Sequence, residues 1–200
     1  MKTAVLVSGR GSNLQTLVKE WKSGHMPIEI IGVGSDQPDA LALEYAQSEG
    51  IPVVVFPMAG YPDRASQEED LLSWLKECRV ELLLLAGYMK ILSGNFIEKA
   101  NIPILNIHPS LLPAFPGMHA QRQALEYGVK YSGCTVHFVD KGLDSGPIIL
   151  QGAVPVLDDD TEDSLSQRIL KEEHRIYPLA VNLVASNKLA IKGHRVFIKQ

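Results

Sequence analysis

The 200-residue sequence contains only two cysteines, Cys78 and Cys134, and neither has the spacing of a metal ligand or of a disulfide framework. This scarcity favours a reduced compartment. No apolar run approaches the roughly 18 residues of a transmembrane helix, so none is predicted. The apolar stretch near the N-terminus is too short for a signal peptide. We therefore expect a cytoplasmic protein with no membrane partner.

An excess of basic residues is also absent. Lys and Arg total 19 against 23 Asp and Glu, which gives a net charge of −4. This balance argues against a general nucleic-acid binder but is compatible with a local basic pocket for a phosphate. Hydrophobic residues make up 46% of the chain, enough for a full core, and the length predicts a single domain over residues 1–200.

Several common signatures of catalytic and nucleotide sites are missing as well. There is no G-x-S-x-G elbow for a serine nucleophile, and no H-E-x-x-H spacing, so we predict no metal. The turn from Gly9 to Asn13 is not a dinucleotide fingerprint, because Leu14 stands where the third glycine belongs. Nor is it a P-loop, because no G-K-[ST] follows.

The first half of the chain alternates short apolar runs with helical patterns. Such alternation predicts an α/β fold, with a mostly parallel twisted sheet and helices on both faces in a Rossmann-like arrangement. Ligands in such sheets bind beyond the carboxyl ends of the strands. The predicted strands are Thr3–Ser8, Glu29–Gly34, Val53–Phe56 and Leu82–Ala86, and the predicted helices are 14–21, Ala40–Glu49 and Arg64–Cys78.

The second half predicts an antiparallel edge to the sheet. A glycine-rich turn joins two strand patterns there, which is typical of an antiparallel pair. A long helix follows, with an expected kink at Pro178. The predicted elements are a strand from Ile104 to His108, a helix Gln121–Tyr127, strands Ser132–Asp140 and Pro147–Pro155, a helix from Thr161 to about Ala185, and a hairpin of Leu189–Ile191 with Arg195–Ile198.

The turn after the first strand is a candidate anion site. A strand, a glycine-rich turn and a helix bring backbone N–H groups and the positive end of a helix dipole to one place. Gly11, Ser12 and Asn13 lie in this turn. The alternative is an ordinary β–α turn in which Ser12 or Asn13 caps the helix.

A carboxamide and an imidazole lie together at the end of the strand from Ile104. Asn106 and His108 are two residues apart, so they share one face of the strand. A loop with three prolines follows, in which Leu112-Pro113 is a candidate cis bond. The amide can donate to a developing oxyanion while the imidazole moves protons, as acyl transfer requires. The alternative is a strand end capped by two hydrogen-bonding side chains.

Two further polar residues lie on the edge strands or between them. Asp144 lies in the turn that joins the two strands, where an aspartate most often forms an Asx turn. His137 alternates with Val136 and Phe138, so it faces either the sheet interior or the cleft.

Several blocks of the sequence, in order and over nearly the whole chain, resemble the folate-dependent formyltransferases. Two blocks are typical of the whole superfamily: Asn106–Pro113 with Pro116, Gly117 and His119, and Thr135–Val139 with Leu143–Gln151. The other blocks are Ser8–Leu14, Ala86–Leu92 and Glu172–Leu179. Of these, the N-terminal glycine loop Ser8–Leu14 points to the purine branch of the superfamily.

The resemblance implies transfer of the formyl group of 10-formyltetrahydrofolate to the amine of glycinamide ribonucleotide in purine synthesis. It implies a phosphate-binding half, 1–100, and a catalytic and folate-binding half, 101–200. It also implies roles for single residues: catalysis by Asn106, His108 and Asp144; substrate binding by Gly11, Ser12, Asn13 and Glu173; and folate binding by Arg64, Met89, Lys90, Ile91, Leu92, Asp140 and Leu143. Lys90 stands where the family commonly has arginine, and lysine lacks the planar fork of arginine.

Three other functions stay open. A formyltetrahydrofolate hydrolase would use the same triad on water, but such enzymes usually carry an extra N-terminal domain, whereas this chain begins at its first strand. A transfer-RNA formyltransferase is typically longer and less acidic. A non-catalytic folate- or nucleotide-binding module would bind without turnover. The sequence does not decide between a monomer and a homodimer.

Overall fold

The computed structural model describes residues 1–199, and it divides into two compact units. The first unit is Met1–Leu105, and the second begins at Asn106. The division falls within strand β5 (Ile104–His108), close to the boundary of the two expected halves. Gln200, the last residue of the single domain expected over 1–200, lies outside the described residues.

The first unit is a parallel sheet in the order β3-β2-β1-β4. The predicted strands and helices of this half are confirmed, with ends that differ by one or two residues. One helix, α4, was not predicted. The elements are β1 (Lys2–Val7), α1 (Ser12–Lys22), β2 (Glu29–Ser35), α2 (Leu41–Ser48), β3 (Val53–Val55), a 3₁₀ turn (Met58–Gly60), α3 (Arg64–Glu77), β4 (Leu82–Leu85) and α4 (Gly94–Ala100).

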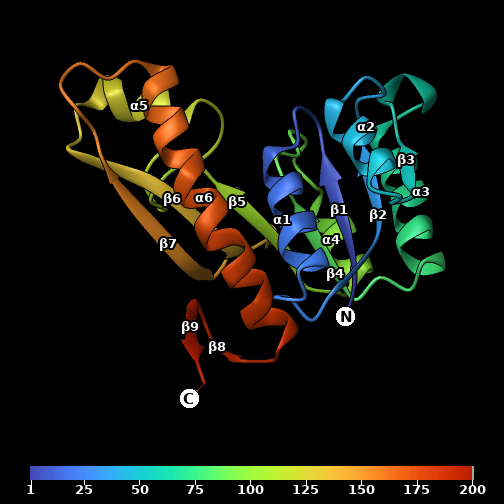
Figure 1. Ribbon diagram of the computed structural model, residues 1–200. Coiled ribbons are helices and arrows are strands. Elements are labelled where there is room, and N and C mark those ends of the chain that lie inside the picture. The colour runs from blue at the N-terminus through green and yellow to red at the C-terminus, as the bar shows by residue number, and fades with distance from the viewer. Residues whose placement is uncertain (200) are drawn as a thin grey trace. The chain divides into compact units, whose positions relative to one another are not determined.

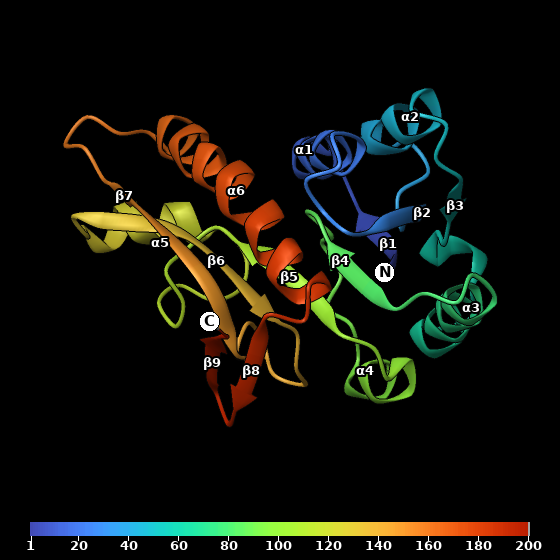
Figure 2. The same ribbon diagram turned by 60° about the horizontal axis from the view of Figure 1, so that its bottom comes forward.

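The strand order explains why helices cover both faces of this sheet. The chain runs outward from β1 to β3 and then returns to the other side of β1 as β4. Because crossovers are right-handed, the outward and returning helices lie on opposite faces. Figure 2 shows α1 and α2 on one side of the strands and α3 and α4 on the other. The order reverses between β1 and β4, and a ligand site is expected at the carboxyl ends of these two strands.

Close packing of α3 on the sheet depends on two glycines in β2. A Cβ atom on Gly32 would lie 2.9 Å from the Trp74 ring, and one on Gly34 would lie 3.4 Å from that ring and 2.7 Å from the side chain of Leu6. The strands between the helix layers are continuous apolar runs because both of their faces are buried; Val5 and Leu84, for example, have no exposed surface.

The second unit has the strand order β5-β6-β7-β9-β8. β6 pairs antiparallel with β7, and β8 antiparallel with β9, so the predicted antiparallel edge and terminal hairpin are confirmed. The other elements are α5 (Ala120–Tyr127), β6 (Tyr131–Phe138), β7 (Ile148–Pro155), α6 (Glu162–Ala185), β8 (Leu189–Lys192) and β9 (Arg195–Ile198).

The two faces of β6 carry different layers. Figure 1 shows α6 lying along β6 and β7, and a Cβ atom on Gly152 of β7 would meet the side chains of Glu172 and Cys134. The proline-rich loop packs on the other face, where Leu111 lies close to Gly133 and the Leu112 N–H donates to Thr135. His137, two residues beyond Thr135, lies near Asn106 of β5 and Asp144 of the β6–β7 turn.

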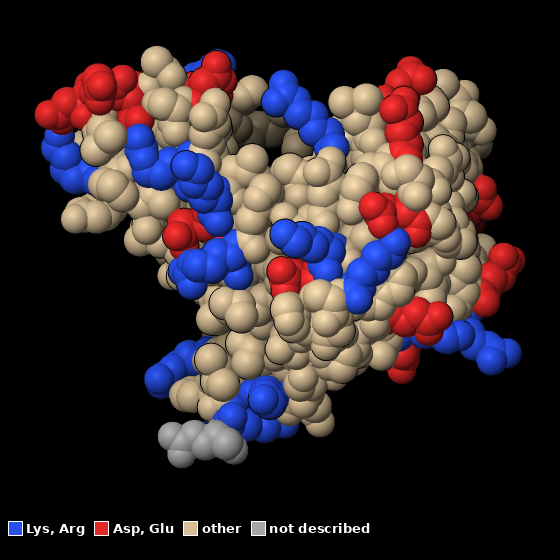
Figure 3. Space-filling model, in the orientation of Figure 1, with Lys and Arg blue, Asp and Glu red and all other residues tan. Residues whose placement is uncertain are grey.

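The long helix α6 begins with a capping box in which the hydroxyls of Thr161 and Ser164 each accept the other residue's backbone N–H. Figure 3 shows carboxylates gathered where β7 leads into this helix, where they complement the helix dipole. These acidic residues are Asp158, Asp159, Asp160, Glu162 and Asp163. Pro178 lies inside the helix, and the kink expected there stays a prediction. Across residues 1–199, no helix is long and apolar enough to cross a membrane.

Candidate functional site

The proline-rich loop that follows β5 is held by two polar side chains of the neighbouring strands. The Thr135 hydroxyl donates to the carbonyl of Ser110 at 2.7 Å and accepts the N–H of Leu112 at 3.0 Å. The Gln151 amide donates to the Leu112 carbonyl at 2.9 Å. The Leu112-Pro113 bond is cis, as the sequence suggested. The hydrogen bonds from Thr135 and Gln151 make the loop a fixed scaffold whose backbone groups can serve as partners for functional side chains.

His108, at the end of β5, is buried between this loop and Asp144. Its Nε2 lies 2.9 Å from the carbonyl oxygen of Phe115, which can only accept a hydrogen bond. Its Nδ1 lies 3.4 Å from Oδ2 of Asp144. Both ring nitrogens thus lie near acceptor atoms, one of the proline-rich loop and one of Asp144. The predicted pairing of His108 with Asp144 is present in the second unit.

Asp144 does not form the Asx turn that its position in the loop made the more common alternative. Its Oδ2 accepts the backbone N–H of Gly117, at the end of the proline-rich loop, at 2.8 Å. Asp140 caps the turn instead, because its Oδ1 accepts the N–H of Gly142 and the hydroxyl of Ser145. Asp144 has φ 50°, a left-handed conformation that aspartate tolerates better than most residues.

Asn106 lies against His137, which projects from β6. The amide Nδ2 of Asn106 is 3.3 Å from Nε2 of His137, and Nδ1 of His137 is 2.9 Å from the carbonyl oxygen of Phe138. His137 is 2% exposed. Burial lowers the pKa of His137, and the nearby Asp144 and the Phe138 carbonyl oppose that shift only in part.

Asn106, His108, Asp144 and His137 thus form one cluster in the second unit. The sequence predicted the first three. It left His137 undecided between the sheet interior and the cleft, and it did not predict the backbone partners at Phe115 and Gly117. The one sequence signal for the position of His137 is the alternation of side chains along its strand, which favours the same face for Thr135 and His137.

The predicted anion-binding turn lies at the carboxyl end of β1 in the first unit. Gly11 is the N-cap of α1 with φ 78°, and no side chain within the described part of the chain caps this helix. The alternative, in which Ser12 or Asn13 caps the helix, does not hold, because Gly11 occupies the cap position in the left-handed conformation. A Cβ atom on Gly11 would lie 2.6 Å from that of Ala42, so α2 packs directly on the turn.

The loops that follow β1 and β4 lie side by side, as expected for a switch point. The Ser8 hydroxyl donates to Oδ1 of Asp36 at 2.5 Å and accepts the N–H of Met89 at 2.9 Å. The Ser8 N–H donates to the carbonyl of Gly87 at 3.1 Å. One serine therefore joins the turn near the anion site to the loop that carries the expected folate-binding residues.

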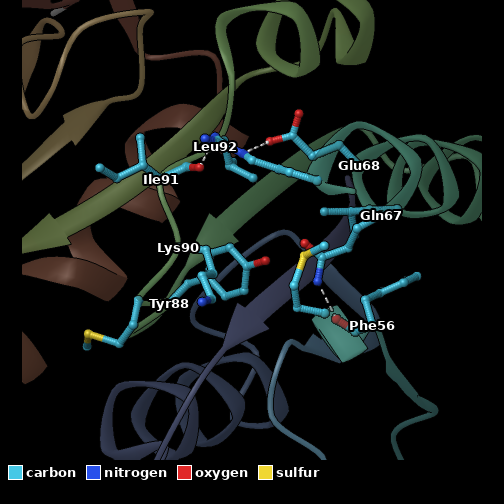
Figure 4. Close-up of a pocket in the computed structure, with 11 residues that line it drawn as sticks. Phe56, Gln67, Glu68, Tyr88, Lys90, Ile91 and Leu92 are labelled. Carbon is cyan, nitrogen blue, oxygen red and sulfur yellow. Dashed lines mark hydrogen bonds and ion pairs between the residues drawn. The ribbon is translucent and has the colours of Figure 1, made fainter. Parts of the chain in front are cut away.

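A pocket of about 300 Å³ lies beside the loop after β4 (Figure 4). All five folate-binding residues expected in the first half line it: Arg64, Met89, Lys90, Ile91 and Leu92. Burial first, and then the charges of Asp36 and Glu68, raise the pKa of Tyr88 in its wall, so the phenol stays neutral. Met89 and Ile91 are 68% and 63% exposed, so their apolar side chains are accessible at this pocket.

Glu68 organises one wall of this pocket. It is buried, pairs with Nε of Arg64 at 2.9 Å and accepts the N–H of Ser93 at 2.8 Å. The Arg64 guanidinium also donates to the carbonyl of Ile91. Arg64 is half exposed, with 51% of its side chain accessible, so it presents a positive charge at the mouth of the pocket.

The remaining expected residues lie in the second unit. Asp140 and Leu143 belong to the β6–β7 turn that carries Asp144, and Leu143 is 51% exposed. Glu173 is buried on α6 and, with burial the larger cause, helps raise the pKa of Cys134 to about 12. No group of three metal-ligating side chains occurs among the residues that the structure describes. The expectation of a metal-free protein stays a prediction.

The fold and the cluster define a class: an α/β protein with a carboxamide, a histidine and a paired carboxylate around a rigid loop, a set suited to acyl transfer. The sequence pattern of the formyl transferase family matches residues 1–181, and the chain belongs to that family. The expectation drawn from its sequence blocks is confirmed at this level.

Relatives within the family indicate the branch. The phosphoribosylglycinamide formyltransferase of Escherichia coli is 40% identical over 99% of this chain and 93% of its own length. The crystal structure of glycinamide ribonucleotide transformylase 1 from Symbiobacterium toebii is 50% identical, with a TM-score of 0.97 over 100% of this chain and 94% of that one. The trifunctional purine biosynthetic protein adenosine-3 of Drosophila melanogaster is 46% identical over 95% of this chain, which spans 14% of its length.

Proposed function

We propose that this protein transfers the formyl group of 10-formyltetrahydrofolate to the amine of 5'-phosphoribosylglycinamide, a step of purine synthesis. The observation that carries the proposal is the cluster of Asn106, His108 and Asp144 around the proline-rich loop, in a chain whose full-length relatives are named for this reaction. The products are the formylated ribonucleotide and tetrahydrofolate. The reaction is a direct transfer without a covalent enzyme intermediate.

The first step is attack of the substrate amine on the formyl carbon, which turns the formyl oxygen into an oxyanion. Asn106 stabilises this oxyanion through an amide hydrogen, and protonated His108 adds a positive charge. Removal of one such donor typically lowers kcat by about 10²–10³-fold.

The second step is departure of the folate nitrogen, which needs a proton. His108 supplies it, and the proton that the attacking amine loses as it becomes an amide restores the charged imidazole. Asp144 orients the ring and stabilises that charged form. To reach the substrate, Nε2 of His108 must give up its hydrogen bond to the carbonyl of Phe115. The Gly117 N–H holds Asp144 in place during this exchange.

Binding uses the two expected halves. The turn of Gly11, Ser12 and Asn13 holds the phosphate of the ribonucleotide at the dipole of α1, and Glu173 binds its glycinamide amine. The folate is bound by the pocket that Figure 4 shows together with Asp140 and Leu143. Lys90 contributes a point charge there, not the bidentate fork of an arginine.

An absorbance assay with 10-formyltetrahydrofolate tests the proposal. We expect release of tetrahydrofolate only when the ribonucleotide is present. Release without it would indicate a hydrolase, and no release with either mixture would indicate a binding module. The relatives named above do not favour these two alternatives.

A further inference from the structure

We propose that His137 is a positioning residue that aims the Asn106 amide, so that an amide hydrogen and not the amide oxygen points at the developing oxyanion. This inference rests on the proposed formyl transfer. It gives a role to a buried histidine that the reaction as described above does not use. Three observations on His137 carry it: its two polar contacts, its burial and its place on β6.

The first step is the position of the single proton on a neutral His137 ring. Nδ1 lies 2.9 Å from the Phe138 carbonyl oxygen, and a carbonyl can only accept, so Nδ1 carries the hydrogen. Nε2 is then a bare lone pair. It lies 3.3 Å from Nδ2 of Asn106.

The second step is the orientation of the amide. A lone pair on Nε2 attracts an N–H group and repels the amide oxygen, so Asn106 must turn its NH₂ group toward His137. That group has two hydrogens. His137 takes one, and the other stays available to a substrate oxygen on the same side of the amide. A flipped amide would present its oxygen to the oxyanion and raise the barrier.

The third step is the charge of His137. A protonated ring would present an N–H at Nε2, and the amide would then turn its oxygen toward the ring. The titratable groups that bear on His137 are Asp144 and Asp140, which favour the charged ring, and His108, which opposes it. Burial outweighs these charges and lowers its pKa, so the ring stays neutral near pH 7.

A direct proton-transfer role fits His137 less well. Its Nδ1 is hydrogen-bonded to the carbonyl oxygen of the next residue, Phe138. Its Nε2 lies 3.8 Å from Oδ1 of Asp144, beyond hydrogen-bonding distance. Among the polar contacts of the described chain, Asn106 is the partner through which His137 can act on the reaction. His137 is therefore a positioning residue and not a general acid.

Two substitutions of His137 in the full-length chain test the inference. His137→Leu fills the space but accepts no hydrogen bond, whereas His137→Gln places an amide oxygen near the position of Nε2. We expect His137→Leu to lower kcat roughly tenfold, the factor that corresponds to loss of one ordinary hydrogen bond, with the KM values little changed. His137→Gln should recover most of that loss.

The same two substitutions are then made in the Asn106→Ala background. If His137 acts only through the amide, His137→Leu should cause no further loss of kcat there, because no amide remains to be aimed. Val136→Ala is the matched control. It removes buried volume from the same strand on the opposite face, so it should lower the unfolding temperature and leave kcat unchanged.

A measurement on the unmodified protein keeps the test independent of any folding defect. Nitrogen-15 NMR of the histidine rings should show His137 neutral at pH 7, with its proton on Nδ1. A proton on Nε2 would overturn the inference. Equal losses of kcat in His137→Leu and His137→Gln would also overturn it, and so would a tenfold loss of kcat from His137→Leu that persists in the Asn106→Ala background. Failure of the unmodified protein to use the ribonucleotide would instead overturn the proposed function.

Discussion

At the scale of single residues, function depends on which partner each polar atom meets. His108 and His137 lie in the same cluster, yet their surroundings differ in kind. His108 has an acceptor at each ring nitrogen, whereas His137 has one acceptor and one amide donor. The roles proposed above differ accordingly: His108 is the proposed proton donor, and His137 is the residue proposed to position Asn106.

The charge of Asp144 can be removed with little change of shape. Asp144→Asn keeps an oxygen for the Gly117 N–H but leaves His108 without its carboxylate. We expect kcat to fall about 10²–10⁴-fold, the range of general acid–base catalysis, with little change in KM for the ribonucleotide. Steady-state kinetics measure both. Asp159→Asn, an exposed control in the same unit, should change neither, and a proportional loss of kcat and binding in Asp144→Asn would contradict the assigned role.

The anion-binding turn offers a matched pair of glycines. Gly11 and Gly24 have φ 78° and 80°, but an added Cβ clashes with Ala42 only at Gly11. Both alanine variants should lose about 1–2 kcal/mol of stability from the left-handed conformation. Only Gly11→Ala should also raise KM for the ribonucleotide, because the turn must move away from Ala42. Equal changes in KM for the two variants would show that the turn is not part of the ribonucleotide-binding site.

At the scale of elements, one strand serves two layers. The even-numbered residues of β6 face α6, and the odd-numbered residues face the proline-rich loop. Thr135 and His137 are therefore near each other but have separate tasks, since the first holds the loop and the second contacts Asn106. The loop in turn supplies the Phe115 carbonyl to His108.

Thr135→Val tests whether the loop depends on this strand. The change keeps the shape of the side chain but leaves the Ser110 carbonyl and the Leu112 N–H without their partner. Each buried polar group left unpaired costs about 1–3 kcal/mol, so we expect a loss of roughly 2–4 kcal/mol in urea unfolding and a lower kcat. Thr3→Val is the control, because that buried hydroxyl has one bond, to Met1. A loss no larger than in the control would count against a loop-holding role.

The start of α6 contains an ion pair whose contribution depends on pH. Asp160 accepts two hydrogen bonds from Arg168, at 2.6 and 2.8 Å, and these bonds hold the pKa of Asp160 well below its usual value. A depressed pKa stabilises the fold above the unfolded value of about 3.9, and that stabilisation is lost as the pH falls further.

Asp160→Asn should therefore be less stable than the unchanged protein at pH 7 and at pH 5, by the same amount. The difference should shrink below about pH 4. Chemical unfolding at several pH values measures this. Asp158→Asn removes a pair between Lys130 and a carboxylate that is 96% exposed, so it should have little effect at any pH. A difference in stability between the two proteins that stays constant down to pH 3 would show that protonation of Asp160 is not linked to unfolding.

At the scale of the whole molecule, the chain consists of two compact units that divide within β5. The expected binding and catalytic residues lie in both, between Gly11 and Glu173. The family pattern ends at residue 181, before the hairpin of β8 and β9. That hairpin joins the second unit through the pairing of Ile148 with Arg195, and most of its side chains are exposed.

Deletion of residues 189–200 tests what the hairpin contributes. We expect kcat to be largely kept, because no residue assigned to binding or catalysis lies in the deleted segment. The unfolding temperature should fall by a few degrees, since each kcal/mol lost from a domain of this size corresponds to roughly 2–4 °C. Scanning calorimetry and the absorbance assay measure the two effects. Loss of turnover with an intact unfolding transition would show that the hairpin contains a functional group.

The order and type of most elements could be predicted from the sequence, because hydrophobic periodicity is a local property. The helix α4 was missed, since Phe96 is the one fully buried side chain in its seven residues and leaves little periodic signal. The N-cap of α1 stayed open at the level of the sequence, because Ser12 and Asn13 are good capping residues by type. In the structure Gly11 takes the cap position, at a place where an added Cβ atom would meet Ala42.

The sequence by itself determined the parallel and antiparallel strands and the glycine turn, and the family resemblance implied a shared site for the strand-end amide, the imidazole and a distant aspartate. These follow from side-chain period, turn chemistry and a resemblance that covers nearly the whole chain. Only the tertiary structure decided which atoms meet: Asp144 with Gly117, His108 with Phe115, and Asn106 with His137. Such contacts join residues 7 to 31 positions apart in the chain. They depend on the packing of β5, β6, the proline-rich loop and the β6–β7 turn against one another.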